Sequence, residues 1–119
     1  MKTEYQILRP SGIHETGVID LPAIPSLQKI REIVDPILNS QRAGADLEHV
    51  RIFSKDGEYV SMFVDDRSAQ FGMKPNPDAT REYHRNIIVH QKAPNIDGIM
   101  PGQSMIHGVA ILFSRNLWN

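Results

Sequence analysis

The fold of this chain is decided by residues 47–66, which read LEHVRIFSKDGEYVSMFVDD. Apolar and polar residues alternate on both sides of the central segment Lys55-Asp56-Gly57-Glu58. An Asp-Gly pair between alternating segments is typical of a two-residue hairpin turn, because both central residues need positive φ angles. We therefore predict a central pair of antiparallel strands. Alternation separates two faces, and we expect the face of Phe53, Tyr59 and Phe63 to be only partly covered.

The segment before this hairpin predicts two strands and a helix. Residues 4–9 and 14–21 form a strand pair, joined by a turn at Pro10-Ser11-Gly12. Ser26 is a favourable helix cap and precedes apolar residues at spacings of three and four. Pro36 lies inside this pattern and should end or kink the helix near Asp35, because proline removes a backbone donor.

The segment after the hairpin predicts a second helix and a last strand. Asn76-Pro77-Asp78 combines a capping residue, a proline at the first helical position and an acid in the first turn. Residues 91–105 contain two prolines and two glycines, and they are expected to form a long loop. The continuous apolar run in residues 106–113 is typical of a strand that is buried on both faces.

These elements follow the order ββαββαβ in a chain of 119 residues, a length that is usual for one domain. Runs of strands interrupted by two helices indicate an α+β fold. We predict a single domain over residues 1–119, with a mostly antiparallel sheet of about five strands and two helices packed on one face.

Composition excludes several classes of function. The chain has 13 basic and 14 acidic residues, and this balance argues against nucleic acid as a partner. It has no cysteine, which excludes disulfides and thiolate metal sites. No apolar run is long enough to span a membrane, and the beginning lacks the apolar core of a signal peptide. We therefore predict a cytoplasmic protein without membrane contact, and no motif predicts a cofactor.

The second half of the chain carries three short motifs. Met62-Phe63-Val64-Asp65 is followed by residues 72–76, GMKPN, which continue into Ala79-Thr80 and Tyr83, and residues 106–112 read IHGVAIL. In these motifs the chain resembles the DUF3846 family, a bacterial and phage domain family of unknown function. Asp66-Arg67-Ser68 departs from the acid and glycine that this family tends to have there. The resemblance implies a small α/β module carried by mobile elements, and it implies no reaction.

We favour a non-catalytic binding module, because charged groups gather near the predicted start of the second helix. A helix N-terminus attracts anions through its free N–H groups and its dipole. The expected ligand is a partner protein or an anionic small molecule. The predicted binding residues are Lys74, Asn76, Arg81, Tyr83 and Arg85. Nucleic-acid contact through Lys74, Arg81, Arg85 and Lys92 is a weaker alternative.

The alternative hypothesis is a small hydrolase. Asp65 and Asp66 end a predicted strand, where paired carboxylates could transfer protons. The candidate catalytic residues are His107 with Asp65 or His84. The five histidines lack the spacing of a metal site, so no metal is predicted. Partly bare aromatic sheet surface and Trp118 also predict a twofold homodimer.

Overall fold

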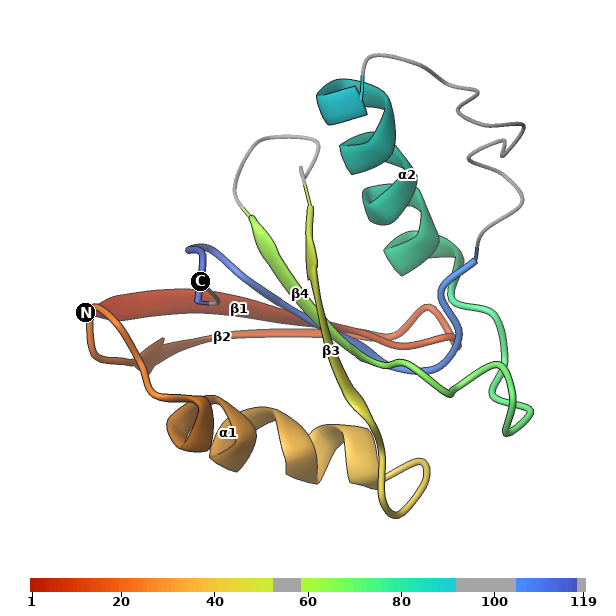
Figure 1. Cartoon of the computed structure of the whole chain (residues 1–119), viewed down its shortest axis with the longest axis horizontal. Coiled ribbons are helices and arrows are strands. Elements are labelled where there is room, and N and C mark those ends of the chain that lie inside the picture. The colour runs from red at the N-terminus through yellow and green to blue at the C-terminus, as the bar shows by residue number, and fades with distance from the viewer. Residues whose placement is uncertain (53–58, 92–104, 118–119) are drawn as a thin grey trace.

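A computed structural model describes residues 1–52, 59–91 and 105–117, and residues 85–91 are described by their backbone only. Five strands form a single sheet, and two helices pack against it (Figure 1). The elements are β1 (Lys2–Leu8), β2 (His14–Asp20), α1 (Leu27–Asn39), β3 (Leu47–Arg51), β4 (Ser61–Asp65), α2 (Pro77–Gln91) and β5 (Ala110–Phe113). The predicted α+β class and the element order ββαββαβ are confirmed.

The strand order is β2-β1-β5-β4-β3, and all neighbouring strands are antiparallel. The last strand in the sequence therefore lies in the middle of the sheet, between the two strand pairs. All four residues of β5 are buried, as the continuous apolar run predicted. β5 is shorter than predicted, because Gly108 has a φ of +75° and residues 106–108 pair instead with residues 74–76.

The predicted pairing of β3 with β4 is confirmed, with Leu47 opposite Asp65 and Val50 opposite Met62. The predicted Asp-Gly turn lies in residues 53–58, outside the described residues. The pair is not central, since β3 forms one edge of the sheet. The expectation of a partly bare aromatic face is wrong for Phe63, which is 0 % exposed. Phe53 and Trp118 lie outside the described residues.

The two helices cover opposite faces of the sheet, so the prediction that both pack on one face is wrong (Figure 1). Ile30, Val34 and Leu38 of α1 pack with Phe63 and other residues of one face. Ala79 and Tyr83 of α2 pack with Met62 and Leu112 of the other face. The physical reason is that β4 and β5 are apolar on both faces, and each apolar face must be covered.

Both predicted helix starts are confirmed. The Ser26 hydroxyl accepts a hydrogen bond from the Lys29 N–H (3.1 Å), and the Asn76 side-chain oxygen accepts one from the Ala79 N–H (3.2 Å). Pro36 does not end α1 near Asp35, because the helix continues to Asn39. Pro36 is on the exposed side, and the next turn buries Leu38. This burial outweighs the loss of one backbone hydrogen bond.

Candidate functional site

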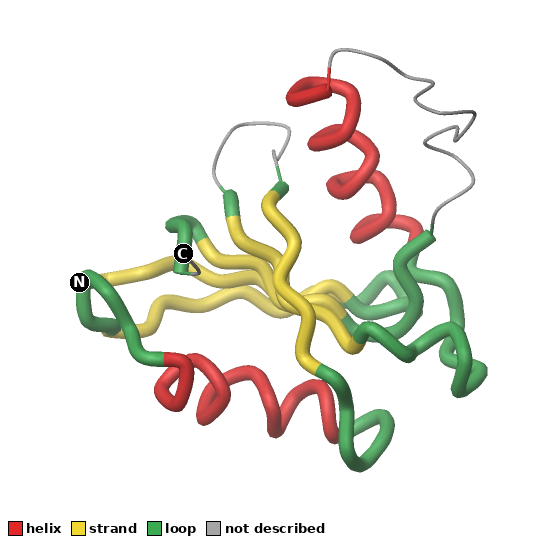
Figure 2. The backbone as a smooth tube through the Cα atoms, viewed as in Figure 1, coloured by secondary structure: helices red, strands yellow, loops and turns green. Residues whose placement is uncertain are grey.

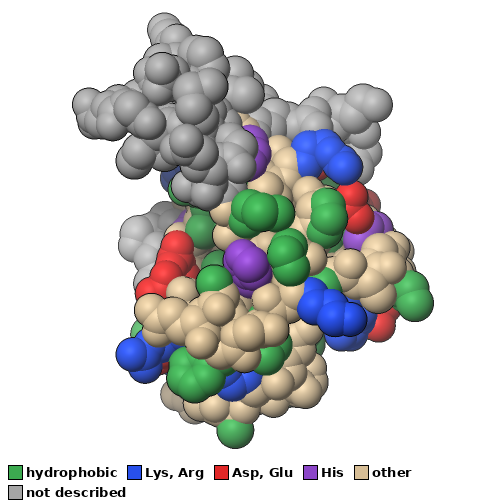
Figure 3. All heavy atoms as spheres, turned by 90° about the vertical axis from the view of Figure 1, so that its right-hand side faces the viewer, with side chains coloured by type: hydrophobic (Ala, Val, Ile, Leu, Met, Phe, Trp, Pro, Cys, Tyr) green, Lys and Arg blue, Asp and Glu red, His purple; other side chains and the backbone are tan. Residues whose placement is uncertain are grey.

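A pocket of about 180 Å³ lies on the α2 side of the sheet. Four segments line it: β3, the end of β4 with the turn after it, the first half of α2, and residues 105–107. Figure 3 shows the side of the molecule that faces right in Figure 1, where hydrophobic side chains surround a histidine. The pocket is therefore built by residues that are far apart in the sequence and that the sheet order brings together.

Two carboxyl groups meet in this pocket, from Glu48 and Asp66. Glu48 lies opposite Val64 in the β3–β4 register, so Asp66 is its diagonal neighbour on the same face. The Asp66 N–H donates to the Asp46 carbonyl oxygen at 2.8 Å, which holds the chain beside β3. A hydrogen bond between the two side chains, together with burial and the charge of Asp66, raises the pKa of Glu48 to about 7. Glu48 therefore keeps its proton up to near-neutral pH and can donate it in the hydrogen bond to Asp66.

Asp65 also borders the pocket, but its hydrogen-bonding capacity is used elsewhere. Its two oxygens accept hydrogen bonds from the Arg42 guanidinium (2.9 and 3.0 Å) and from the N–H groups of Asp46 and Arg67 (2.9 and 3.1 Å). Burial alone would raise the pKa of Asp65, but these hydrogen bonds and the Arg42 charge outweigh it and lower the pKa. Asp65 is thus an ionised anchor for residues 42–46 and not an available acid or base.

His107 enters the pocket from the segment just before β5. Its Nδ1 lies 2.9 Å from the Met73 carbonyl oxygen, a contact in which Nδ1 carries the proton. In the neutral ring, Nε2 then holds the lone pair. The neighbouring Gly108 has a positive φ, and an added Cβ would lie 2.8 Å from the Gln41 side-chain oxygen. Only glycine fits there, and this tight turn positions the His107 ring.

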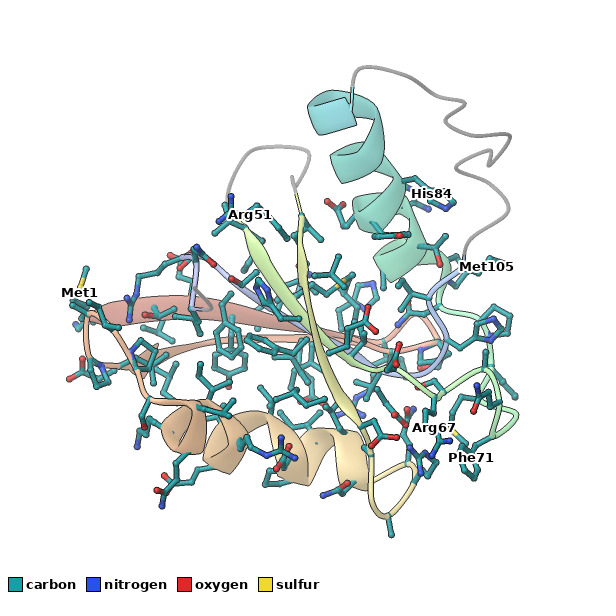
Figure 4. All side chains as sticks on the ribbon, in the orientation of Figure 1. Met1, Arg51, Arg67, Phe71, His84 and Met105 are labelled. Atoms are coloured by element: carbon teal, nitrogen blue, oxygen red, sulfur yellow. The ribbon has the colours of Figure 1, made fainter. Side chains whose placement is uncertain are left out.

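Tyr83 lines the pocket from α2, whereas His84 does not. The two rings are 5.9 Å apart between centroids, and Figure 4 shows His84 on the side of α2 that faces away from β3 and β4. The structure thus brings His107 and Asp65 to one pocket but leaves His84 outside it. Successive residues of a helix point in directions about 100° apart, which explains why one of the two is excluded.

The predicted binding residues near the start of α2 serve several different purposes. Asn76 is 0 % exposed and donates to the carbonyl oxygens of Leu8 (2.9 Å) and Gly108 (2.8 Å), so it joins α2 to the sheet. Arg81 is exposed and pairs with Asp78 at 3.0 Å, and Asp78 also contacts His14 Nε2 at 2.7 Å. A carboxylate therefore already occupies the first turn of α2. Lys74 is exposed, and the Arg85 side chain lies outside the described part of the chain.

A second pair of polar side chains lies on the α1 face. His49 Nε2 is 3.1 Å from the Ser61 hydroxyl oxygen, which also accepts a hydrogen bond from the Leu117 N–H at 3.1 Å. Burial and the charge of Arg51 lower the pKa of His49. Ser61 is 0 % exposed, so no substrate could reach its hydroxyl. This pair holds the chain after β5 against the sheet.

Sequence reasoning missed Glu48, although a signal was present. Side chains along a strand point to alternate faces, so Glu48 shares a face with Val50 and Ile52, which pack in the core. A carboxylate on the core-facing side of a strand is costly unless it shares a proton or pairs with a cation. The partner, Asp66, could be found only once the register was known.

Comparison with protein-family models, with curated proteins and with solved structures found no match. The resemblance to the DUF3846 family therefore stays a prediction. Neither described helix has the length and hydropathy that a membrane-spanning segment needs. Among the side chains that the structure describes, in residues 1–52, 59–84 and 105–117, no three from histidine or acidic residues are grouped so that they could hold a metal ion.

Proposed function

We propose that this protein is a small-ligand-binding module whose ligand carries a positive charge and a short apolar body. The observation that carries this proposal is the pair of carboxyl groups, Glu48 and Asp66, inside a pocket of about 180 Å³. A concave site with an apolar wall, a few converging polar groups and a perturbed pKa is the usual form of a ligand pocket.

The charge of the pocket favours a cationic ligand. The described residues that line it include three acids and no lysine or arginine. Asp65 is neutralised by Arg42, which leaves Glu48, whose proton Asp66 helps to retain, and Asp66 itself. A bound ammonium or guanidinium group would replace that proton and pair with both carboxylates. Its affinity should therefore rise as the pH rises through about 7.

The remaining walls suit the apolar part of such a ligand. Val50 and Val64 line the pocket from the sheet, Tyr83 from α2, and Ile106 from the segment before β5. The ring of Tyr83 can also attract a cation through its π face. His107 offers a further polar contact through its second ring nitrogen.

Capture of an anionic ligand or a partner protein by Lys74, Arg81 and Arg85 has less support. Arg81 is already paired with Asp78, and Asn76 is fully buried. Neither Lys74 nor Arg81 lines the pocket. An anion would therefore have to compete with the Asp78 carboxylate at the helix start.

The proposal is tested with three probes of matched size: butylammonium, butylguanidinium and butyrate. The NMR signals of the Tyr83 and His107 rings should shift with the two cations and not with butyrate. Glu48→Gln or Asp66→Asn should weaken cation binding about tenfold, because each removes one charge partner. Glu32→Gln is the matched control, since it makes the same change at an exposed site on α1.

Three outcomes would reject the proposal. The first is equal or stronger binding of butyrate, which would support the anionic alternative. The second is cation binding that survives in Glu48→Gln and Asp66→Asn. The third is the absence of any shift at Tyr83 and His107 with all three probes.

A specific observation also favours acid–base catalysis as a second candidate. Glu48, with a pKa of about 7, and His107 line the same pocket, and a general acid or base is most effective when its pKa is near the working pH. Hydrolysis of p-nitrophenyl acetate should then be lost in both Glu48→Gln and His107→Asn. His84→Asn should retain it, because His84 lies outside the pocket.

A further inference from the structure

The strand β2 forms one edge of the sheet, and its outer side has no strand beside it in the described residues (Figure 2). The Leu21 N–H donates to the Met1 carbonyl oxygen at 2.9 Å, and this bond shows which residues of β2 form backbone hydrogen bonds to β1. The odd-numbered residues of β2 therefore bond to β1. The even-numbered residues direct their N–H and C=O groups outward: His14, Thr16, Val18 and Asp20.

The opposite edge of the sheet is better protected. β3 has five residues, four of them half-buried, and α2 packs beside it. β2 has seven residues, pairs with β1 without a bulge, and contains no proline or lysine. Edge strands usually avoid pairing with another chain through proline, bulges and charged side chains, lysine especially, and of these β2 has only the charged Glu15 and Asp20.

Three large apolar residues in or near β2 in the sequence are exposed. Val18 is 60 % exposed, and Ile13 and Ile24, which flank the strand in sequence, are 67 % and 78 % exposed. Val18 thus adds an exposed apolar side chain to the strand whose backbone groups point outward.

We propose that β2 pairs with β2 of a second copy of this chain, antiparallel and centred on Gly17, to form one continuous sheet across the dimer. In this register Gly17 lies opposite its counterpart, Thr16 opposite Val18, and His14 opposite Asp20 of the second copy. The whole strand is paired, and every outward N–H and C=O group of the four even-numbered residues finds a partner. No two like charges lie opposite each other, and Thr16 with Val18 is a favourable β-branched pair.

Gly17 suits the centre of such a pairing. On the α1 face it is covered by the Tyr5 ring of the neighbouring strand, and an added Cβ would lie 2.5 Å from the Tyr5 hydroxyl oxygen. Any larger residue at position 17 would displace the Tyr5 ring within one chain, and the glycine also keeps the twofold axis free of side chains. This surface is separate from the pocket, so the inference does not depend on the proposed ligand.

The test uses a proline on each edge of the full chain. Thr16→Pro removes only an outward N–H and should preserve the monomer fold, because edge strands tolerate proline at such positions. Arg51→Pro is the matched control, since Arg51 also directs its N–H outward, but from β3. Sedimentation equilibrium should give twice the 13.5 kDa of one chain for the wild type and for Arg51→Pro. Thr16→Pro should weaken dimerisation about tenfold or more.

Hydrogen exchange provides a second measurement that does not depend on any variant. The amides of Thr16 and Val18 should become protected as wild-type concentration rises, whereas the amide of His49 should not change. A wild-type chain that stays monomeric at high micromolar concentration would overturn the proposal. A dimer that persists in Thr16→Pro would also overturn it. The same holds for a dimer that Arg51→Pro dissociates while the amides of Thr16 and Val18 stay unprotected from hydrogen exchange.

Discussion

The two faces of the sheet are covered in different ways. On one face, α1 buries a continuous stripe of Ile30, Val34 and Leu38 against aromatic rings, including Phe63 and Phe113, whose centroids are 5.8 Å apart. On the other face, the described core residues of α2 are Ala79 and the half-buried Tyr83. A helix with a regular apolar stripe, such as α1, covers its sheet face completely. A helix with fewer apolar residues toward the sheet, such as α2, leaves room for a pocket with polar groups.

The largest expected effect is on the α1 face. Phe63→Ala should lower the free energy of unfolding by about 3 to 5 kcal/mol, because it leaves a cavity where a fully buried ring was packed. Val50→Ala, on the α2 face beside the pocket, should cost only about 1 to 1.5 kcal/mol, since Val50 is partly exposed. Urea denaturation measures both losses, and equal losses would contradict the difference between the faces.

The attachment of α2 to the sheet should be next in size. Asn76→Ala removes the helix cap and leaves the carbonyl oxygens of Leu8 and Gly108 without their buried donor. The expected loss is about 2 to 4 kcal/mol. Asn76→Ser keeps a cap but not the two carbonyl contacts, so its urea midpoint should fall between those of wild type and Asn76→Ala. If serine restored full stability, Asn76 would act as a cap alone.

The smallest effect concerns the pocket and depends on pH. The pKa of Glu48 is about 7 in the folded chain and its ordinary value is 4.5, so the folded state binds more protons between these values. The contribution of Glu48 to stability is therefore fully present below about pH 4.5 and is lost as the pH rises through about 7. Glu48→Gln should remove this loss, which we expect to be about 1 to 2 kcal/mol after solvent screening.

Urea denaturation at about pH 5 and about pH 8 measures this difference. Glu32→Gln should follow the wild-type profile, because Glu32 is exposed on α1 and is remote from the carboxyl pair. A wild-type protein whose stability rises between these two pH values, with Glu48→Gln showing the same rise, would mean that Glu48 does not keep its proton up to near-neutral pH.

Local patterns predicted the elements of this fold well. Ser26 and Asn76 cap the two helices because their side chains compete for nearby backbone donors, which is a property of a few neighbouring residues. The prediction that Pro36 could end the helix near Asp35 failed, because it used local information only. The local cost of this proline was known from the sequence, but the burial of Leu38 that outweighs this cost depends on a partner layer.

The candidate site was only half predictable. Asp66 and His107 were both considered for acid–base chemistry but not as neighbours, and Tyr83 was predicted to bind an anionic ligand or a partner protein. Their convergence requires that the last strand enter between β1 and β4, which carries His107 toward α2 and the β4 end. Glu48 escaped notice because a single acid in a strand carries no information about its cross-strand neighbour.

The sequence by itself determined where strands and helices form, because alternation, capping and turn residues act over short distances. It also determined that both faces of β5 would be buried. Only the tertiary structure decided the strand order, the placement of the helices on opposite faces, and the meeting of Glu48 with Asp66. These three features depend on contacts between residues remote in sequence. The free energy gained by burying those residues is spread over the whole sheet, so no single segment determines the arrangement.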